Sequence, residues 1–237
     1  MLKVGIIGVG VMGGGHARFI KKHIPEAVVV ALSDVATEKM DQLASELGTV
    51  KFKTSDPAEL MNHSEVAAVI IASPDPLHKA HLQLAIASGK PTLCEKPIAT
   101  TIEDARSIAA EIKKYEMDKG KQLIHFGFMR RFDPCYIKVR ELVETGKYGL
   151  PLFIRPVTRN VSSTGATTPG LYTNIAIHDF DIFRWMFNSD WVSVESHYPK
   201  QSTMSQTGLA DPLVITAKMA NGIMMVADIV AFNNYGY

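Results

Sequence analysis

Three glycines near the amino terminus have the spacing that a dinucleotide-binding turn requires. Gly8, Gly10 and Gly13 follow an apolar run and open a stretch with helical periodicity. The first glycine permits a tight turn, the second lets the backbone approach a pyrophosphate, and the third lets the helix pack closely on the strand. The helix start, with Val11 and Met12, would present free amides to the phosphates. The pattern predicts a dinucleotide site.

An acidic residue follows the second apolar run. Asp34 lies about 20 residues beyond the glycines, where a carboxylate accepts hydrogen bonds from both ribose hydroxyls. The same carboxylate repels a 2′-phosphate, so the sequence predicts NAD as the cofactor, with NADP less favoured.

Further candidate residues follow the fourth and fifth apolar runs. Ser73, Pro74 and His78 come after the fourth, and Glu95 and Lys96 come directly after the fifth. Because the carboxyl ends of parallel strands share one edge with the glycine turn, we expect these five residues to contact the cofactor.

The elements that must position these residues change character near the middle of the chain. Up to residue 126, short apolar runs alternate with amphipathic stretches, as in a parallel sheet wrapped by helices. We therefore predict an α/β fold: a doubly wound, dinucleotide-binding Rossmann domain over residues 1–126, then an α+β domain with an open, mainly antiparallel sheet over residues 127–237 for substrate binding and oligomerisation. Because the last strand would leave an open edge, we expect this second domain to be incomplete at its carboxyl end.

The individual elements follow from periodicity and from capping residues. Strands are expected at 3–8, 27–33, 49–53, 66–72, 92–95, 122–128, 152–160, 191–198, 213–219 and 223–231, and helices at 12–23, 36–47, 76–88, 102–117, 133–145 and 174–187.

Composition excludes several classes of function. The 237 residues carry a formal net charge of +1, which gives no field for nucleic acid. Two cysteines, Cys94 and Cys135, form no disulfide framework, and we predict no metal site. No apolar stretch approaches the ~20 residues that span a bilayer. The first strand begins too early for a signal peptide, so we expect a cytoplasmic protein.

Taken together, the segments GVGVMGGGH, CEKPIATT, FGFMRRFD, HDFDIFRW and the terminal YGY resemble the Gfo/Idh/MocA family of oxidoreductases, and within it the inositol 2-dehydrogenase-like members. EKP after the fifth strand, followed later by HDxD on a helix, is much more specific than the glycine pattern. The resemblance implies NAD-dependent oxidation of a secondary hydroxyl on a cyclic polyol or sugar such as myo-inositol. It also implies a homodimer or homotetramer.

The resemblance also assigns catalytic roles. Lys96 matches the family lysine that hydrogen-bonds the substrate oxygen or relays its proton, and His178 matches the general base. Asn174 lies four residues before His178, on the same helix face, where inositol dehydrogenases carry aspartate. An amide can orient the ring but adds no charge. Either Asp181 supplies that charge, or the base is weaker, or the substrate differs from inositol.

Three more residues fall where family members gather polar groups around the substrate hydroxyls. These are Arg130, Asn160 and Tyr235, which we expect to bind substrate together with Asn174 and His178.

Two other functions stay open at this point. One is a glucose–fructose oxidoreductase-like enzyme that uses NADP, against which Asp34 argues. The other is a non-catalytic, nucleotide-sensing regulator of the same fold, for which Asn174 is the only support.

Overall fold

A computed structural model describes residues 1–161, 163 and 165–233, and the chain forms two compact units, Met1–Gly127 and Phe128–Tyr237. Each unit has its own sheet and its own apolar core. The division falls one residue after the position expected from the sequence.

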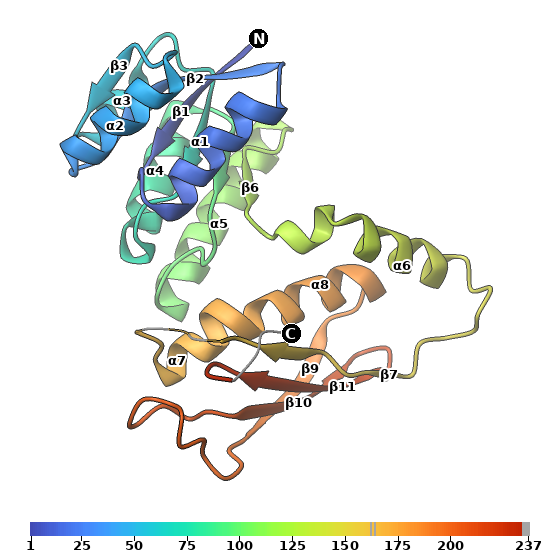
Figure 1. Ribbon diagram of the computed structural model, residues 1–237. Coiled ribbons are helices and arrows are strands. Elements are labelled where there is room, and N and C mark those ends of the chain that lie inside the picture. The colour runs from blue at the N-terminus through green and yellow to red at the C-terminus, as the bar shows by residue number, and fades with distance from the viewer. Residues whose placement is uncertain (162, 164, 234–237) are drawn as a thin grey trace. The chain divides into compact units, whose positions relative to one another are not determined.

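The amino-terminal unit is a six-stranded parallel sheet with helices on both faces (Figure 1). Its elements are β1 (Leu2–Ile7), α1 (Val11–His23), β2 (Ala27–Ser33), α2 (Thr37–Leu47), β3 (Phe52–Thr54), α3 (Pro57–Asn62), β4 (Ala68–Ile71), η1 (Asp75–Leu77), α4 (His78–Ser88), β5 (Thr92–Cys94), α5 (Ile102–Lys119) and β6 (Ile124–Phe126). The strand order is β3-β2-β1-β4-β5-β6, which confirms the doubly wound prediction. The order reverses between β1 and β4, and doubly wound sheets bind ligands at such a point.

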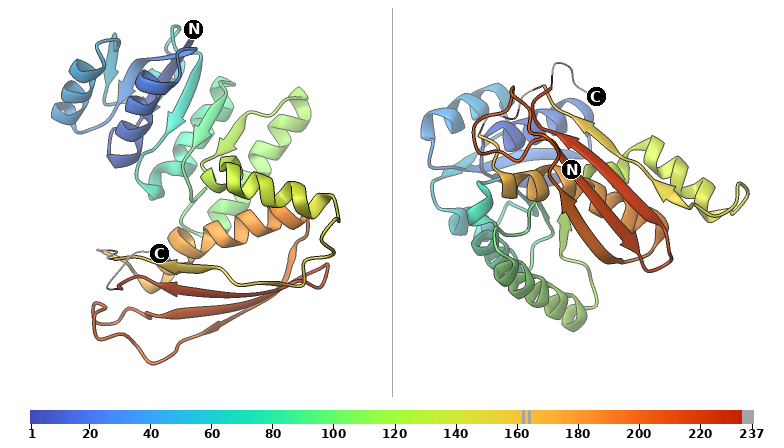
Figure 2. Two further views of the ribbon diagram at one scale, coloured as in Figure 1. Left: turned by 45° about the vertical axis from the view of Figure 1, so that its right-hand side comes forward. Right: turned by 90° about the horizontal axis from the view of Figure 1, so that it is seen from below.

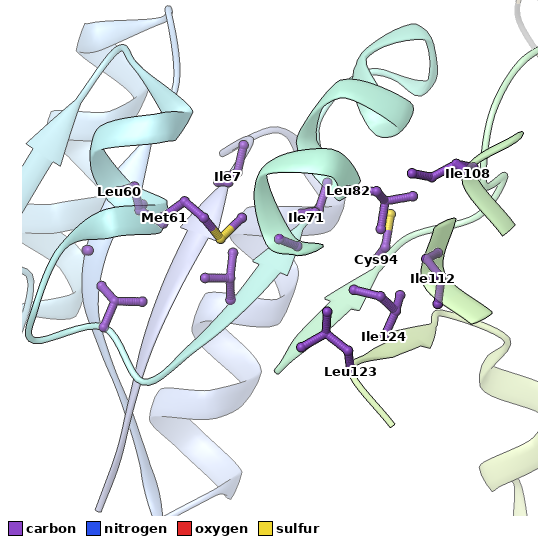
Figure 3. Close-up of a cluster of buried hydrophobic side chains, with 14 of the residues drawn as sticks. Ile7, Leu60, Met61, Ile71, Leu82, Cys94, Ile108, Ile112, Leu123 and Ile124 are labelled. Atoms are coloured by element: carbon purple, nitrogen blue, oxygen red, sulfur yellow. The ribbon is translucent and has the colours of Figure 1, made fainter. Parts of the chain in front are cut away.

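Alternation along the strands builds one core on each face of this sheet. Successive side chains of a strand point to opposite faces, so Ile6 of β1 packs with α1 and α2 while Ile7 packs with α3, α4 and α5. Figure 3 shows the second cluster, in which Ile71 and Cys94 on the strands lie near Leu82 of α4. Both faces are covered, which explains why these strands are nearly continuous apolar runs.

The edge strands are shorter than the sequence indicates. The strands expected at 49–53 and 122–128 cover only Phe52–Thr54 and Ile124–Phe126. Each has a single neighbour in the sheet, and each pairs through three residues only. Regular strand structure is therefore limited to the residues that pair with the single neighbouring strand, and the sequence pattern alone does not show where that pairing stops.

The carboxyl-terminal unit has a mixed five-stranded sheet with helices against one face (Figures 1 and 2). Its elements are η2 (Met129–Phe132), α6 (Pro134–Glu144), β7 (Phe153–Ile154), β8 (Val157–Arg159), α7 (Thr168–Gly170), η3 (Leu171–Ala176), α8 (Ile177–Phe187), β9 (Trp191–His197), β10 (Leu213–Met219) and β11 (Met224–Val230). Strands β9, β10 and β11 are antiparallel, whereas β7 and β8 run parallel to β11.

Alternate residues of β10 and β11 pack against α8 and η3. Leu213, Ile215 and Ala227 are among those buried on this side. The opposite face exposes Lys218 of β10 and Met224 of β11, which are paired across the two strands. The sheet is thus covered on one face only within this unit.

Two elements of this unit differ from the predictions. The strand expected at 152–160 is divided into β7 and β8, because Pro156 has no amide hydrogen to continue the ladder. The helix expected at 174–187 begins earlier, at Thr168, where the Thr167 side chain accepts the Gly170 amide. It then widens into a π-helical turn, η3, before α8 starts at Ile177.

Within the described part of the chain, the helices are all too short or too polar to cross a lipid bilayer.

Candidate functional site

The glycine turn after β1 leaves no room for side chains at two of its three positions. Gly8 has φ +90°, and a Cβ there would lie 2.5 Å from the Ala72 carbonyl oxygen. A Cβ on Gly13 would lie 1.8 Å from the carbonyl oxygen of Gly8. A Cβ on Gly10 would meet no heavy atom within 4 Å. Gly10 therefore faces open space, which is where a phosphate can approach the backbone.

Helix α1 starts directly at this turn. Its N-cap residue is Gly10, which has no side chain to cap the amino terminus, and the Val11 and Met12 side chains are exposed. The first amides of a helix have no acceptor within the helix, and they carry the positive end of its dipole. An anion can therefore be bound here by the backbone alone.

Asp34 is held at the end of β2 by two backbone amides. Its Oδ2 accepts a hydrogen bond from Val9 N–H at 2.7 Å, and its Oδ1 accepts one from Ala36 N–H at 2.8 Å. These bonds fix the carboxylate while leaving lone pairs for a ligand hydroxyl.

A cavity of about 430 Å³ joins the glycine turn to Asp34. Backbone, carboxylate and apolar side chains line it, which suits the phosphate, ribose and base of a dinucleotide. Its walls are Ile7, Gly8, Gly10, Val11, Met12, Ser33, Asp34, Val35, Ser55, Pro57, Ala72, Ser73, Pro74, Leu77 and His81. The residues present therefore fit NAD.

Ser73 and Pro74 lie on the cavity wall as expected, but His78 does not. The His78 side chain is fully buried, with Nδ1 2.6 Å from the Pro97 carbonyl oxygen and Nε2 2.9 Å from the Ser73 carbonyl oxygen. The expected direct contact between His78 and the cofactor is therefore corrected to an internal role. His81, one turn later, contacts the Ser73 hydroxyl at 2.9 Å and lines the cavity instead.

Burial, followed by the charge on His78, lowers the pKa of His81. His81 therefore presents a neutral imidazole to the cavity at neutral pH.

The Lys96 turn follows β5. Lys96 is half-buried, and the bond from Lys96 to Pro97 is cis. Glu95 is buried, and its Oε1 lies 2.7 Å from His16 Nε2. The Glu95 carboxylate, predicted to contact cofactor, thus has a partner inside the protein.

Burial alone would raise the pKa of Glu95. The hydrogen bond and charge of His16, together with the amide and charge of Lys96, outweigh it, so the pKa of Glu95 lies below its usual value. Glu95 is consequently ionised at neutral pH.

In the carboxyl-terminal unit, His178 and Asn174 lie on consecutive turns. His178 is half-buried near the start of α8, and Asn174 is exposed in η3. Asn174 lines a cavity of about 240 Å³ with Thr167 and Gly170 among its other walls. Its Nδ2 lies 3.7 Å from where a Cβ on Gly170 would stand. The amide therefore lies at the wall of a hollow lined by both polar and apolar side chains.

Two ion pairs hold this helix to the η2 turn. Arg130 Nη1 donates to Asp179 Oδ1 at 2.5 Å, and Arg131 Nε donates to Asp181 Oδ2 at 2.8 Å. A second nitrogen of Arg131 donates to the other Asp181 oxygen. Asp181 is therefore committed to Arg131, which argues against its supplying charge to His178.

Asp179 differs from Asp181 in its surroundings. Only 2% of it is exposed, and among the residues that the structure describes its Oδ2 has no hydrogen-bond partner. Burial raises the pKa of Asp179, and the bond and charge of Arg130 oppose that shift only in part. The expected substrate ligand Arg130 has one of its nitrogens occupied here.

Of the remaining expected substrate ligands, Asn160 lies at the end of β8. Its Nδ2 donates to Ser163 Oγ at 3.1 Å, and its backbone N–H donates to the Val230 carbonyl at 3.0 Å. Tyr235 lies outside the described residues.

Each of the two units matches a known protein-family model. The model of an oxidoreductase family with an NAD-binding Rossmann fold matches residues 2–119, and the GFO/IDH/MocA C-terminal domain matches residues 136–237. The chain belongs to the Gfo/Idh/MocA family of oxidoreductases. Inositol 2-dehydrogenase 1 of Saccharopolyspora erythraea is 35% identical over all 237 residues, and the chain covers 69% of that relative.

Solved structures of this family are similar throughout the chain. Myo-inositol dehydrogenase of Lactobacillus casei, in complex with NAD(H) and myo-inositol, superposes with a TM-score of 0.93 at 30% identity. Scyllo-inositol dehydrogenase of the same organism, with NAD(H) and scyllo-inositol, gives 0.89 at 27%. Each covers the whole of this chain, which spans 69% and 72% of them respectively. The predicted family and NAD as its cofactor are therefore confirmed.

In this Gfo/Idh/MocA member, seven of the predicted cofactor residues line the cavity, namely Gly8, Gly10, Val11, Met12, Asp34, Ser73 and Pro74, whereas His81 and several other wall residues were not predicted. His16, Asp179 and the bond of Asp181 to Arg131 were not predicted as parts of the site. The sequence carried a signal for His16, which follows the glycine turn in the GGGH segment. The arginine pair and the two aspartates are about fifty positions apart, and no spacing rule links them.

The described residues hold no cluster of three or more histidine, cysteine or acidic side chains that could bind a metal ion.

Proposed function

We propose that this chain is an NAD-dependent dehydrogenase that oxidises a secondary alcohol of a cyclic polyol, myo-inositol or a close analogue, by transferring a hydride from the carbon that bears the hydroxyl to NAD⁺. The observation that supports the proposal is that the glycine turn borders the same cavity as Asp34. We call this turn, which contains Gly8, Gly10 and Gly13, the glycine cradle. The inositol dehydrogenases to which the chain is similar support the choice of substrate class.

NAD⁺ supplies the hydride acceptor when it is bound. The amides at the start of α1 bind the pyrophosphate beside Gly10, and Asp34 accepts hydrogen bonds from the adenosine ribose hydroxyls. A 2′-phosphate would bring negative charge against Asp34, so NADP binds more weakly. Ser73 and Pro74 complete the wall of this cavity.

Oxidation of an alcohol needs a base for the hydroxyl proton and a donor that stabilises the developing alkoxide. We assign the donor to Lys96, directly after β5, and the base to His178 on α8. Asn174 orients the substrate or the base through its amide, without the charge that an aspartate would add. Arg130, Asn160 and Tyr235 bind further hydroxyls of the substrate, which is how such a site rejects deoxy analogues.

The test measures formation of NADH by absorbance with a panel of ring polyols and sugars, each with NAD⁺ and with NADP⁺. We expect turnover of at least one inositol with NAD⁺, and a loss of about 100-fold or more in kcat for Lys96→Met and His178→Ala. Preference for NADP⁺ with glucose would instead indicate a glucose–fructose oxidoreductase-like enzyme. Binding of NAD without turnover of any compound would indicate the nucleotide-sensing regulator.

We also propose that copies of this chain associate through the exposed sheet face of the carboxyl-terminal unit. On that face Met224 is nearly half exposed, and Val214 and Val226 are partly exposed. Light scattering coupled to gel filtration should give a dimer or tetramer. A monomer at all concentrations would contradict this part of the proposal.

A further inference from the structure

The position of Lys96 is not fixed by regular secondary structure. β5 ends at Cys94 and α5 begins only at Ile102, so Lys96 lies in a seven-residue connection, 95–101. The last ladder bonds near it are Glu95 N–H to the Ile71 carbonyl at 2.9 Å and Gly127 N–H to the Cys94 carbonyl at 2.8 Å. Side-chain contacts must therefore hold the turn.

On one flank, the residue before Lys96 is held by a histidine of α1. His16 Nε2 lies 2.7 Å from Glu95 Oε1, and the Glu95 side chain is buried. The carboxylate lies against Gly127, where a Cβ would stand 2.8 Å from Glu95 Oε2. Gly127 therefore limits movement of the Glu95 carboxylate on one side, and movement away from His16 would break the contact with its ring.

On the other flank, the residue after Lys96 is held by a histidine of α4. His78 Nδ1 lies 2.6 Å from the Pro97 carbonyl oxygen, and Nε2 lies 2.9 Å from the Ser73 carbonyl oxygen. A carbonyl can only accept, so each contact is a hydrogen bond when the ring nitrogen carries hydrogen. Because His78 is fully buried, an apolar replacement would leave both carbonyls without this partner.

We propose that His16 and His78 are positioning residues for Lys96. His16 ties the turn to the helix that begins at the glycine cradle, and His78 ties it to the Ser73 loop that lines the cavity. We assign neither histidine a direct part in the chemical step. Both act by holding the Lys96 ammonium in its position relative to the cofactor site. A displacement of the ammonium by about 1 Å would lower the rate of the chemical step strongly. The inference rests on the proposed role of Lys96.

The experiment compares His16→Phe and His78→Phe, which remove the ring nitrogens, with His16→Gln and His78→Gln, which keep one N–H donor. His125→Phe is the matched control, because His125 is an exposed histidine of β6 in the same unit. We expect the Phe variants to lower kcat about 10- to 100-fold, with a KM for NAD⁺ within about 3-fold of wild type. The Gln variants should recover part of the loss, and the control should match wild type.

A double-mutant cycle separates positioning from general damage. In a Lys96→Met background, either Phe substitution should lower the residual kcat by less than about 2-fold, because both histidines act through Lys96. An equal fold-loss in both backgrounds would overturn the proposal.

A second measurement does not depend on turnover. Hydrogen–deuterium exchange of the cofactor-free chain should be faster over residues 92–98 in the Phe variants, and in milder form in the Gln variants if a Phe variant fails to fold. Unchanged exchange there would also overturn the proposal. If wild type turns over no polyol, the proposed function fails, and the exchange result still decides whether the histidines hold the turn.

Discussion

The two units hold their functional residues by different physical means. At the cofactor cavity of the amino-terminal unit, unlike at its Lys96 turn, backbone geometry does most of the positioning: Gly8 and Gly13 exclude side chains, and backbone amides orient Asp34. In the carboxyl-terminal unit, charged side chains do it: Arg130 and Arg131 hold α8, which carries His178, through Asp179 and Asp181.

The difference predicts different tolerances to substitution. The glycine cradle should lose its structure when a single methyl group is added at Gly8 or Gly13, because that group would overlap backbone atoms. A helix held by buried ion pairs fails when one partner is removed, because the other charge is left buried and unpaired.

The largest effect should come from the glycine cradle. A Cβ on Gly13 would overlap the Gly8 carbonyl oxygen, whereas a Cβ on Gly15, on the same helix, meets nothing within 4 Å. We expect Gly13→Ala to lower the free energy of unfolding by about 4 kcal/mol or more and to abolish measurable NAD binding. Gly15→Ala should be neutral or stabilise by up to about 1 kcal/mol. Urea melts and calorimetric titration with NAD check this, and equal behaviour of the two variants would contradict the cradle.

The ion pairs should give the next largest effect. Arg130→Met leaves the Asp179 carboxylate buried without its cation, so we expect a loss of about 3–5 kcal/mol in the free energy of unfolding. The control is Arg184→Met on α8, whose pair with Asp190 is mostly exposed and should contribute less than about 1 kcal/mol. Similar urea midpoints for the two variants would show that the buried pair does not hold α8.

The same difference explains which features could be predicted from the sequence. The glycine turn, Asp34 and the alternation of strands and helices depend on local spacing and periodicity, and the structure has the predicted doubly wound sheet with both site features on one cavity. The helix containing Asn174 was predicted as regular α-helix, but widening into a π turn depends on packing against β11, which periodicity does not report. The internal role of His78 could not be predicted either, because a histidine after a strand can face the ligand or the core equally well.

Two buried carboxylates, one in each unit, should respond to pH in opposite directions. The pKa of Glu95 is lowered in the fold, so its contribution to stability is present above its ordinary value of 4.5 and is lost as the pH falls through the folded value. The pKa of Asp179 is raised, so its contribution is present below its ordinary value of 3.8 and is lost as the pH rises through the folded value.

Thermal melts from pH 3 to pH 7 should therefore separate Glu95→Gln from Asp179→Asn. The deficit of Glu95→Gln relative to wild type should shrink as the pH falls, because wild type then loses the ionised carboxylate too. The stability of Asp179→Asn relative to wild type should improve as the pH rises, because only wild type must ionise a buried acid. If the difference in melting temperature from wild type changed with pH in the same way for both variants, the opposite pKa shifts of Glu95 and Asp179 would be contradicted.

The smallest effect concerns Asn174, which lines the 240 Å³ cavity one turn before His178. Asn174→Asp adds a carboxylate near the proposed base, and a nearby negative charge favours the protonated imidazole. Activity that requires neutral His178 should then begin at higher pH, so the acid limb of the kcat/KM profile should move upward by about one pH unit or less. Asn174→Ser, which adds no charge, is the control and should leave the limb in place. An acid limb that stays fixed in Asn174→Asp while activity persists would show that the group titrating there is not influenced from position 174, and the base would then have to be sought elsewhere than at His178.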